Sequence, residues 1–407
     1  MSVQAAQPWW EFATAARISF GRGVSRFLPD AADSLGQRVL VVADPALVHA
    51  GVSEPLVAAL RGRPGTDLLV WDQGEPETGM RRAEECAAAV RGFAPSVVVA
   101  VGGGSTMDLA KVVAARLLAG HAIGDWPRKG TPDRALPVVA LPTTAGTGSE
   151  VTPVAVLTDE ERNVKVGLTS AAFLPRVVLV DPLLTLSCPP HVTAHSGMDA
   201  LSHALEAYFA RGFDERSPLT FAQAGFCGKN PVSDALALPA VALIAGHLVR
   251  AVADGGDVEA RESMALASLL AGMAFAKAGT GIVHALQYPV GAATKTPHGL
   301  GNAVLMPSAV RFNLPSRRRE AAAVARALGC DATDDAECGE QLPGLLTALA
   351  RSVGIEPGLD TLGVTEAELA GFAAAAAGIT RLTQNNPRPV DAEALHGVLR
   401  DALHASS

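Results

Sequence analysis

Residues 97–108 are Val-Val-Val-Ala-Val-Gly-Gly-Gly-Ser-Thr-Met-Asp. The five apolar residues at the start predict a strand that is buried on both faces of a sheet. The glycines that follow let a phosphate approach the backbone, and the helix expected to begin near Thr106 offers unpaired N–H groups to it. A tight strand–helix turn without a ligand is the alternative, because the glycines lack the G-x-G-x-x-G spacing. The residues of this candidate diphosphate turn are Gly102, Gly103, Gly104 and Ser105.

Other apolar runs of the same kind occupy the first half of the chain, at residues 39–43, 68–71, 138–141 and 177–180. They alternate with alanine-rich helical segments, which predicts a parallel sheet covered by helices on both faces. Residues 154–158 and 164–168 flank a polar turn, and we expect them to form a hairpin attached to the main sheet. Beyond residue 181 the strand signals end, and apolar residues recur at helical spacing.

These patterns predict two domains. Residues 1–186 are expected to form an α/β dinucleotide-binding domain with a Rossmann-like parallel sheet, and residues 187–407 an all-α domain. A chain of 407 residues with 49% hydrophobic content is long enough to bury both cores. The least regular segment, residues 211–231, is predicted to be a long loop.

Composition excludes several classes of function. The net charge is −8 and no lysine or arginine cluster stands out, which argues against a nucleic-acid partner. The five cysteines have no paired spacing, so we expect reduced thiols. The N-terminus lacks the pattern of a signal peptide, and the apolar runs at residues 235–249 and 264–276 are shorter than a membrane span. We therefore expect a cytoplasmic protein without a membrane partner.

Two further features of the first half concern a cofactor. Residues 142–150 place threonines and glycines directly after a strand, where a parallel sheet holds its ligand; a surface turn is the alternative. Asp44 ends the strand at residues 39–43, and a carboxylate there can accept bonds from ribose hydroxyls and repel a 2′-phosphate. This position favours NAD over NADP, unless Asp44 merely starts the next helix.

A metal site is predicted in the second half. Asp199 and His203 are four residues apart in a helical run, so both side chains lie on one face. His284 and His298 supply two more imidazoles from another apolar helical region. One carboxylate with three imidazoles suits Fe²⁺ or Zn²⁺ better than Mg²⁺ or Ca²⁺, although Ni²⁺, Mn²⁺ and Co²⁺ stay open. The alternative is a set of core histidines without a ligand role.

The sequence resembles the iron-containing (group III) alcohol dehydrogenases, a family that includes lactaldehyde reductase and 1,3-propanediol dehydrogenase. The resemblance extends from residue 21 to residue 389. Its motifs are residues 102–105 with Asp108 and Lys111, residues 142–151, residues 197–206 and residues 296–299.

The resemblance implies a fold of the dehydroquinate synthase and iron-containing alcohol dehydrogenase type, with the metal in a cleft between the two domains and a dimer or larger homo-oligomer. It implies that the metal ligands are Asp199, His203, His284 and His298. It also implies that the residues that meet the cofactor are those of the turn at 102–105 with Thr143, Thr144 and Thr147, and that Lys165 lies near the ribose.

Three departures from the family concern the substrate. Many relatives carry a second histidine four residues after the third ligand, and Tyr288 stands there in this chain. The segment at residues 211–229 is longer than expected and directly follows the helix that carries two ligands. Lys295 precedes His298 by three residues, where a cation could meet an anionic substrate; a solvated surface lysine is the other interpretation.

The predicted activity is NAD-dependent interconversion of a small primary alcohol and its aldehyde, chiefly aldehyde reduction, with the metal polarising the substrate oxygen. A polar or anionic aldehyde is expected, such as a semialdehyde, phosphonoacetaldehyde or sulfoacetaldehyde. The alternatives are a maleylacetate-reductase-like enzyme, a glycerol-dehydrogenase-like or dehydroquinate-synthase-like enzyme, and an NAD-binding sensor without turnover.

Overall fold

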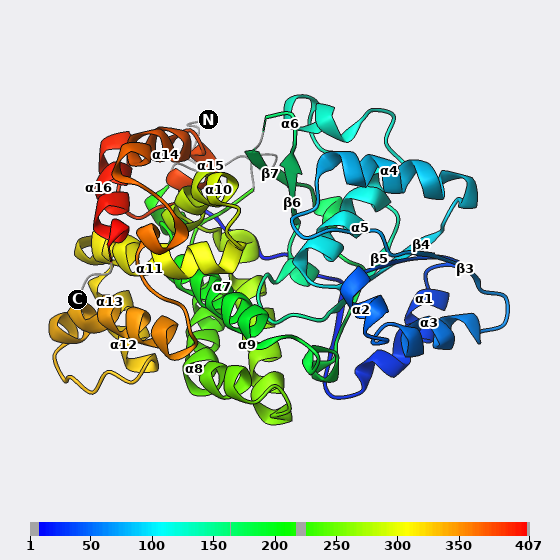
Figure 1. Cartoon of the computed structure of the whole chain (residues 1–407), viewed down its shortest axis with the longest axis horizontal. Helices are drawn as coiled ribbons and strands as arrows, with labels where there is room; N and C mark the ends of the chain where they lie inside the picture. The colour runs from blue at the N-terminus through cyan, green and yellow to red at the C-terminus, as the bar shows by residue number, and fades with distance from the viewer. Residues whose placement is uncertain (1–7, 163, 217–224, 405–407) are drawn as a thin grey trace, which may run out of the picture. The chain divides into compact units, whose positions relative to one another are not determined.

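The computed structural model describes residues 8–162, 164–216 and 225–404 (Figure 1). The chain packs into two compact units. The α/β unit comprises Thr14–Thr193 with Asp254–Leu269, and the helical unit comprises Ala194–Ala253 with residues 270–404 and the N-terminal segment. The predicted domain boundary between residues 186 and 187 stays a prediction, while the packing itself divides within helix α7 (Pro190–Phe209).

The α/β unit is built on a parallel sheet of six strands in the order β1-β8-β5-β4-β2-β3. The strands are β1 (Arg17–Phe20), β2 (Arg38–Ala43), β3 (Asp67–Trp71), β4 (Val97–Gly102), β5 (Val138–Pro142) and β8 (Val177–Val180). The five apolar runs are five of these strands, which confirms the predicted parallel sheet. β1 is absent from the prediction because its four residues lie at a sheet edge and are not uniformly apolar.

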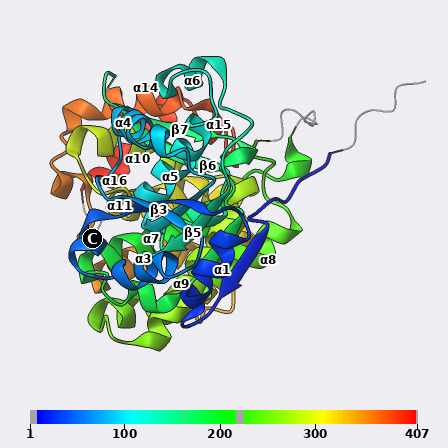
Figure 2. The same cartoon turned by 90° about the vertical axis from the view of Figure 1, so that its right-hand side faces the viewer.

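Helices cover both faces of this sheet, as Figures 1 and 2 show. Alternate strand residues such as Val39, Val99 and Leu141 pack with α1 (Leu28–Asp33) and α3 (Glu54–Arg61) in one core. The opposite face is covered by α5 (Gly104–Arg116) and α4 (Met80–Val90). Burial on both faces explains why the central strands carry no polar side chain.

The hairpin forms as predicted, but its attachment differs. β6 (Val154–Asp159) and β7 (Val164–Thr169) pair antiparallel and make a separate two-stranded sheet, so the predicted junction with the main sheet is wrong. Side chains of α5 take the place of a neighbouring strand. The Val156 N–H donates to Asp108 (2.8 Å), and Lys111 donates to the Val154 carbonyl (2.9 Å).

No strand follows β8 in the part of the chain that the structure describes, as the all-α prediction requires. The helices are α7, α8 (Pro231–Ala253), α9 (Val258–Ala278), α10 (Ile282–Thr294), α11 (His298–Asn313), α12 (Arg318–Ala327), α13 (Asp335–Ser352), α14 (Leu369–Ala377), α15 (Thr380–Thr383) and α16 (Ala392–Leu403). By length and composition α8 could cross a membrane, with one third of its apolar window buried. It packs on α12 and α13, and buried helices of soluble proteins have the same composition, so this is weak evidence of a span.

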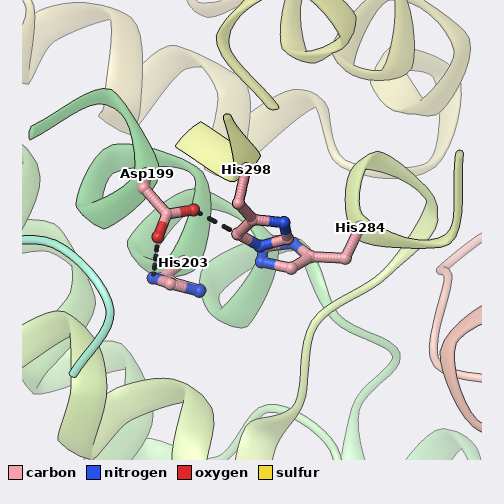
Figure 3. Close-up of side chains that lie close together, drawn as sticks. All are labelled: Asp199, His203, His284 and His298. Carbon is pink, nitrogen blue, oxygen red and sulfur yellow. Dashed lines mark ion pairs between the residues drawn. The ribbon is translucent and has the colours of Figure 1, made fainter. Parts of the chain in front are cut away.

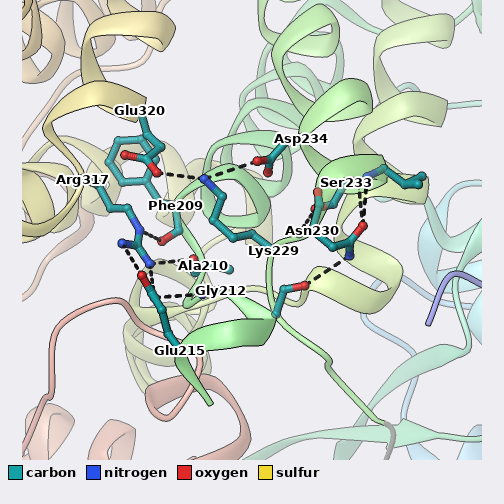
Figure 4. A network of polar contacts seen from close by, with 12 residues as sticks. Phe209, Ala210, Gly212, Glu215, Lys229, Asn230, Ser233, Asp234, Arg317 and Glu320 are labelled. Atoms are coloured by element: carbon teal, nitrogen blue, oxygen red, sulfur yellow. Dashed lines mark hydrogen bonds and ion pairs between the residues drawn. The ribbon is translucent and has the colours of Figure 1, made fainter. Parts of the chain in front are cut away.

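Polar contacts hold both described ends of the segment at residues 211–229 (Figure 4). Arg317 donates to the carbonyls of Phe209, the last residue of α7, and of Ala210, and it forms an ion pair with Glu215 (2.6 Å). At the other end, Lys229 lies 2.8 Å from Glu320 of α12. The segment is predicted as an irregular loop; residues 217–224 lie outside the described residues.

Candidate active site

The helical unit brings the four predicted metal ligands together (Figure 3). Asp199 and His203 lie one turn apart on α7, His284 lies in the first turn of α10, and His298 is the first residue of α11. One ligand atom from each side chain lies within 4.8 Å of the others. Asp199, His203 and His284 are buried, and the His298 side chain is 29% exposed. The site is therefore shielded from water except at His298, where solvent can reach it.

Neighbouring side chains fix the orientation of two imidazoles. His284 Nδ1 lies 2.5 Å from Glu206 Oε2, and His298 Nδ1 lies 2.7 Å from Gln287 Oε1. Since these oxygens are acceptors, each Nδ1 carries the proton and each Nε2 keeps its lone pair for a metal. Glu206 also accepts a bond from the Val283 N–H (2.7 Å), so it holds the beginning of α10 and its histidine at once.

A third polar side chain shows that the ligand atoms face one point. The Asn302 Nδ2 atom lies 2.8 Å from Asp199 Oδ1, 3.4 Å from His284 Nε2 and 3.3 Å from His298 Nε2. The fourth ligand, His203, stacks on the Phe275 ring with centroids 4.2 Å apart. The cluster is thus braced from several sides by residues that are not themselves ligands.

The donor set fits Fe²⁺ or Zn²⁺. Atoms that share one such ion at about 2.0–2.2 Å lie at most roughly 4.4 Å apart, which is close to the observed spread of 4.8 Å. Imidazole nitrogens with one carboxylate are ligands that these ions prefer over the oxygen shells of Mg²⁺ and Ca²⁺. Burial alone would raise the pKa of Asp199, but the three imidazoles and the Asn302 amide hold that pKa below its ordinary value.

A glycine sets the distance between two of the helices. A Cβ atom at Gly299 would lie 2.1 Å from the carbonyl oxygen of His195, so α11 begins in direct backbone contact with α7. This approach brings His298 to the ligands on α7. Gly299 therefore needs to be glycine for a packing reason, which the motif around His298 does not reveal by itself.

Two predicted substrate residues have different surroundings. The Tyr288 ring centroid lies 6.1 Å from that of His298, and its hydroxyl lies 3.2 Å from an Arg381 nitrogen. Lys295 is exposed and caps the C-terminal end of α10 in the left-handed region, with φ 58°. Tyr288 thus lies beside a metal ligand, and the substrate role of Lys295 stays a prediction.

The α/β unit brings the two predicted cofactor loops into contact. A Cβ atom at Gly103 would meet Thr144 at 3.2 Å, and one at Gly104 would meet Thr147 at 2.5 Å. The turn at residues 102–105 therefore packs directly on the threonine loop, at the carboxyl ends of the neighbouring strands β4 and β5. Gly104 begins α5, whose first N–H groups lie at this turn, as a phosphate site needs.

The other predicted cofactor residues already have protein partners. Asp44 accepts a bond from the Ala46 N–H (2.8 Å) and begins α2 (Pro45–His49), which is the alternative that the sequence left open. Lys165 lies 2.7 Å from Glu77, and the Ser105 hydroxyl accepts the Glu77 N–H (3.1 Å). Thr143 is buried at the end of β5. Their contacts with a cofactor stay predictions.

A buried charged cluster lies behind these loops. Lys111 donates to the Ser149 hydroxyl (2.7 Å), which in turn donates to Asp108 (2.6 Å). Burial lowers the pKa of Lys111 to about 8 and raises the pKa of the nearby Glu150 to about 7. The cluster ties the threonine loop to α5, so the two loops hold a fixed relative position.

Sequence reasoning does not find the residues that brace the metal ligands. Glu206 follows His203 by three residues, Gln287 follows His284 by three, and Asn302 follows His298 by four. Each polar residue thus lies one helical turn beyond a ligand, on the same face. That spacing is the signal that could have identified them.

Comparison with known proteins gives the family. Residues 15–182 match the family Iron-containing alcohol dehydrogenase, and residues 193–403 match the Fe-containing alcohol dehydrogenase family, C-terminal. The NAD-dependent methanol dehydrogenase of Bacillus methanolicus is 34% identical over 387 residues, which cover 94% of this chain and 97% of that protein.

Solved structures agree with this match. A 1,3-propanediol oxidoreductase superposes with a TM-score of 0.89 at 33% identity and covers 97% of this chain and 100% of its own. The sulfoacetaldehyde reductase from Bifidobacterium kashiwanohense, solved in complex with NAD⁺, superposes with a TM-score of 0.84 at 30% identity, over 98% of this chain and 100% of its own. The predicted cofactors, NAD and Fe²⁺, fit this family, and the Asp199 cluster fits Fe²⁺. The chain belongs to the iron-containing alcohol dehydrogenase family and is an oxidoreductase of that type.

Proposed function

We propose that this protein interconverts a small primary alcohol and its aldehyde with NAD, chiefly in the direction of aldehyde reduction. The observation that carries the proposal is the convergence of Asp199, His203, His284 and His298 within 4.8 Å. When bound there, Fe²⁺, or Zn²⁺ as the alternative, polarises the substrate oxygen, and NAD carries the hydride.

The residues of the chain supply the geometry. Glu206 and Gln287 keep the Nε2 atoms of His284 and His298 unprotonated and directed inward. Asn302 holds the Asp199 carboxylate by its Oδ1 atom. A set of ligands that is oriented before the reactants arrive spends no free energy on reorganisation during the reaction.

The cofactor site consists of the two packed loops of the α/β unit. The N–H groups at the beginning of α5 bind the diphosphate, and Lys165 lies on the ribose side. Its residues are Asp44, Gly102, Gly103, Gly104, Ser105, Thr143, Thr144, Thr147 and Lys165. The free oxygen of the Asp44 carboxylate disfavours a 2′-phosphate, while its other oxygen caps α2.

The role of Asp44 can be tested without removing the N-cap of α2. Asp44→Asn keeps a capping oxygen but removes the charge, so we expect the ratio of NADP to NAD turnover to rise about tenfold, corresponding to about 1.4 kcal/mol of lost repulsion. Steady-state rates with each cofactor measure this ratio. An unchanged ratio would remove Asp44 from the cofactor site.

The substrate is proposed to be a small polar or anionic aldehyde, such as a semialdehyde, phosphonoacetaldehyde or sulfoacetaldehyde. The similar reductase from Bifidobacterium acts on sulfoacetaldehyde, by its name, and so supports this choice. Tyr288 beside the metal ligands and Lys295 at the end of α10 are the predicted substrate residues. A cytoplasmic location and a homodimer or larger assembly stay predictions.

Metal removal tests the activity directly. The purified protein is stripped with a chelator, and NADH oxidation is followed with short aldehydes before and after Fe²⁺ or Zn²⁺ is added back. We expect the stripped protein to lose turnover and one of the two ions to restore it. Full turnover without any metal would contradict the proposal, and NADH binding without oxidation of any aldehyde would favour the sensor.

A further inference from the structure

The hydroxyl of Tyr288 has no hydrogen-bond acceptor for its proton among the residues that the structure describes. An arginine side chain only donates hydrogen bonds, so the 3.2 Å contact with Arg381 makes the Tyr288 oxygen the acceptor. The proton of that hydroxyl must therefore point to another group. Among the described residues, none accepts it. Tyr288 is only 7% exposed, so a buried donor is left for a ligand.

Arg381 is a half-buried cation, and its contacts within the described chain are with neutral groups. Its guanidinium lies on the Tyr288 hydroxyl and over the Phe226 ring, 5.8 Å from the centroid. No carboxylate of the described chain lies within ion-pair distance of it. Arg317 and Arg116, in contrast, pair with Glu215 and Glu84. An unpaired charge that is partly removed from water loses solvation, and an anion would compensate for that loss.

A second guanidinium adds to the positive charge at this place. Arg216 donates to the Phe226 carbonyl (3.0 Å) and to the Asn385 amide oxygen, both of them neutral acceptors. Its buried Nε atom has no partner among the described residues. Two arginines thus flank Phe226, and neither has a carboxylate in its hydrogen bonds.

Tyr288 lies beside the predicted metal ligands. Tyr288 is one helical turn beyond His284 on α10, and its ring is 6.1 Å from the His298 ring. A substrate whose oxygen lay at the metal ligands and whose carbon chain extended past His298 would reach the Tyr288 ring. An anionic group at the other end of a short substrate would then meet the Tyr288 proton and the Arg381 charge together.

We infer that Tyr288 and Arg381 form a subsite for the anionic end of the substrate, a carboxylate, sulfonate or phosphonate. The Tyr288 hydroxyl donates to one oxygen of this group, and Arg381 donates to another while it holds the phenol in place. This inference rests on the proposed aldehyde reduction. It assigns the recognition of charge to Arg381, which the sequence did not single out, and not to the exposed Lys295.

Two aldehydes of similar shape but different charge test the subsite in the holoenzyme. Sulfoacetaldehyde carries a sulfonate where 3,3-dimethylbutanal carries a neutral tert-butyl group of similar shape. For Arg381→Met we expect kcat/KM with sulfoacetaldehyde to fall about 30-fold to 1000-fold, chiefly through KM, and kcat/KM with the neutral aldehyde to stay within about threefold. Arg381→Lys should recover part of the loss, and Tyr288→Phe should lower the rate with the anion about tenfold.

Arg388 provides a matched control. It also lies over a phenylalanine ring, 4.1 Å from the centroid of Phe312, and donates to a backbone carbonyl. Arg388→Met should leave the preference between the two aldehydes unchanged. Thermal midpoints and metal content are compared across the variants, so a folding defect would appear with both substrates and in these measurements.

Two outcomes would overturn the inference. One is an equal loss with both aldehydes in a folded, metal-loaded Arg381→Met variant. The other is an Arg381→Met variant in which only the KM for NADH rises. That result would mean that Arg381 binds a phosphate of the cofactor and not the substrate. Succinic semialdehyde, compared with pentanal, repeats the test for a carboxylate.

Direct binding separates this inference from the proposed function. Titration of the holoenzyme with methanesulfonate, an unreactive anion, should show binding that Arg381→Met weakens at least tenfold. If no aldehyde is reduced but this binding is found, the activity is wrong and the subsite stands. If aldehydes are reduced but Arg381→Met leaves the binding of the anion unchanged, the subsite is wrong and the activity stands.

Discussion

Two buried polar clusters in this protein arrange their hydrogen bonds in different ways. In the α/β unit, Lys111 donates to Ser149, to the Thr152 carbonyl (3.2 Å) and to the Val154 carbonyl (2.9 Å), so its three donors are all used. In the helical unit, the Asp199 cluster directs its ligand atoms toward one point. The charges of the first cluster are satisfied within it, whereas the ligand atoms of the second converge as binding of an ion requires.

The difference lies in where the supporting bonds attach. Around the metal ligands, Glu206 and Gln287 bind the far nitrogens of His284 and His298, so that the near nitrogens face the cluster. Around Lys111, Ser149 lies between the charges and satisfies both. Burial of charged residues therefore does not identify a site by itself; the direction of the remaining donors and acceptors does.

The largest effect is expected where a ligand is removed. Asp199→Ala or His284→Ala should lower kcat at least about 1000-fold, since a lost Lewis acid removes several kcal/mol of transition-state stabilisation. The amount of bound metal should fall together with kcat, while the variants keep the fold. Turnover, elemental analysis and circular dichroism measure the three properties.

His247 is the control for this change, because among the described residues its Nδ1 atom bonds to the Leu243 carbonyl of its own helix and to no metal ligand. His247→Ala should keep both metal and turnover. Normal activity in Asp199→Ala would instead show that the Asp199 cluster is structural, like the Lys111 cluster, and holds no catalytic metal.

Breaking the Lys111 cluster should lower the stability of the α/β unit. Lys111→Met leaves Asp108 as an uncompensated buried charge, which costs about 3–5 kcal/mol of the free energy of unfolding of this unit. Denaturant titration followed by fluorescence measures it. Lys129→Met, which breaks an exposed pair with Asp125, should leave the unfolding midpoint unchanged. A Lys111→Met protein as stable as the wild type would show that the Lys111 cluster is not a structural one.

A smaller effect is expected when the support of a ligand is weakened. Glu206→Gln keeps the shape of the side chain but removes its charge, so we expect metal affinity to fall about 10-fold to 100-fold. Competition with a chelator of known affinity measures the change without any turnover. Glu262→Gln, in an exposed pair with Arg22, is the control. Unchanged affinity in Glu206→Gln would mean that Glu206 serves only as the cap of α10.

The smallest effect concerns pH. Burial raises the pKa of Glu150 from 4.5 to about 7, so the folded chain binds this proton more tightly than the unfolded chain does. Its contribution to stability is complete below about pH 4.5 and is lost as the pH rises through about 7. Glu150→Gln should remove about 1–3 kcal/mol of this pH dependence.

Denaturation midpoints at pH 5 and pH 8 check the Glu150 prediction. Lys111 contributes in another window, because burial lowers its pKa from 10.5 to about 8 and stability from it rises between those values. If the denaturation midpoint changes equally between pH 5 and pH 8 in the variant and in the wild type, the role of Glu150 is refuted.

The sequence allows the prediction of features that depend on local spacing. Uniform apolar runs predict five of the six sheet strands, and the interval between Asp199 and His203 predicts a ligand pair on one helical face. Family resemblance adds the complete ligand set. Features that depend on distant contacts are missed: β1 is held by its pairing with β8, and the hairpin is held by the side chains of α5.

The same limit applies to the substrate end of the site. Arg381 is 93 residues from Tyr288 in sequence, and nothing in its surroundings on α15 indicates that they meet. Lys295, which is close to His298 in sequence, is an exposed helix cap in the structure. The contact between Tyr288 and Arg381 thus could not be predicted from proximity along the chain, and the substrate role of Lys295 stays a prediction.

The backbone contact between Gly299 and His195 ties the identity of one residue to the geometry of the metal ligands. Because α11 and α7 touch at that point, any side chain at position 299 would have to separate the two helices. Their separation would carry His298, the first residue of α11, away from Asp199 and His203 on α7. The ligand set is thus set by a glycine that binds nothing as well as by the four side chains that would hold the ion.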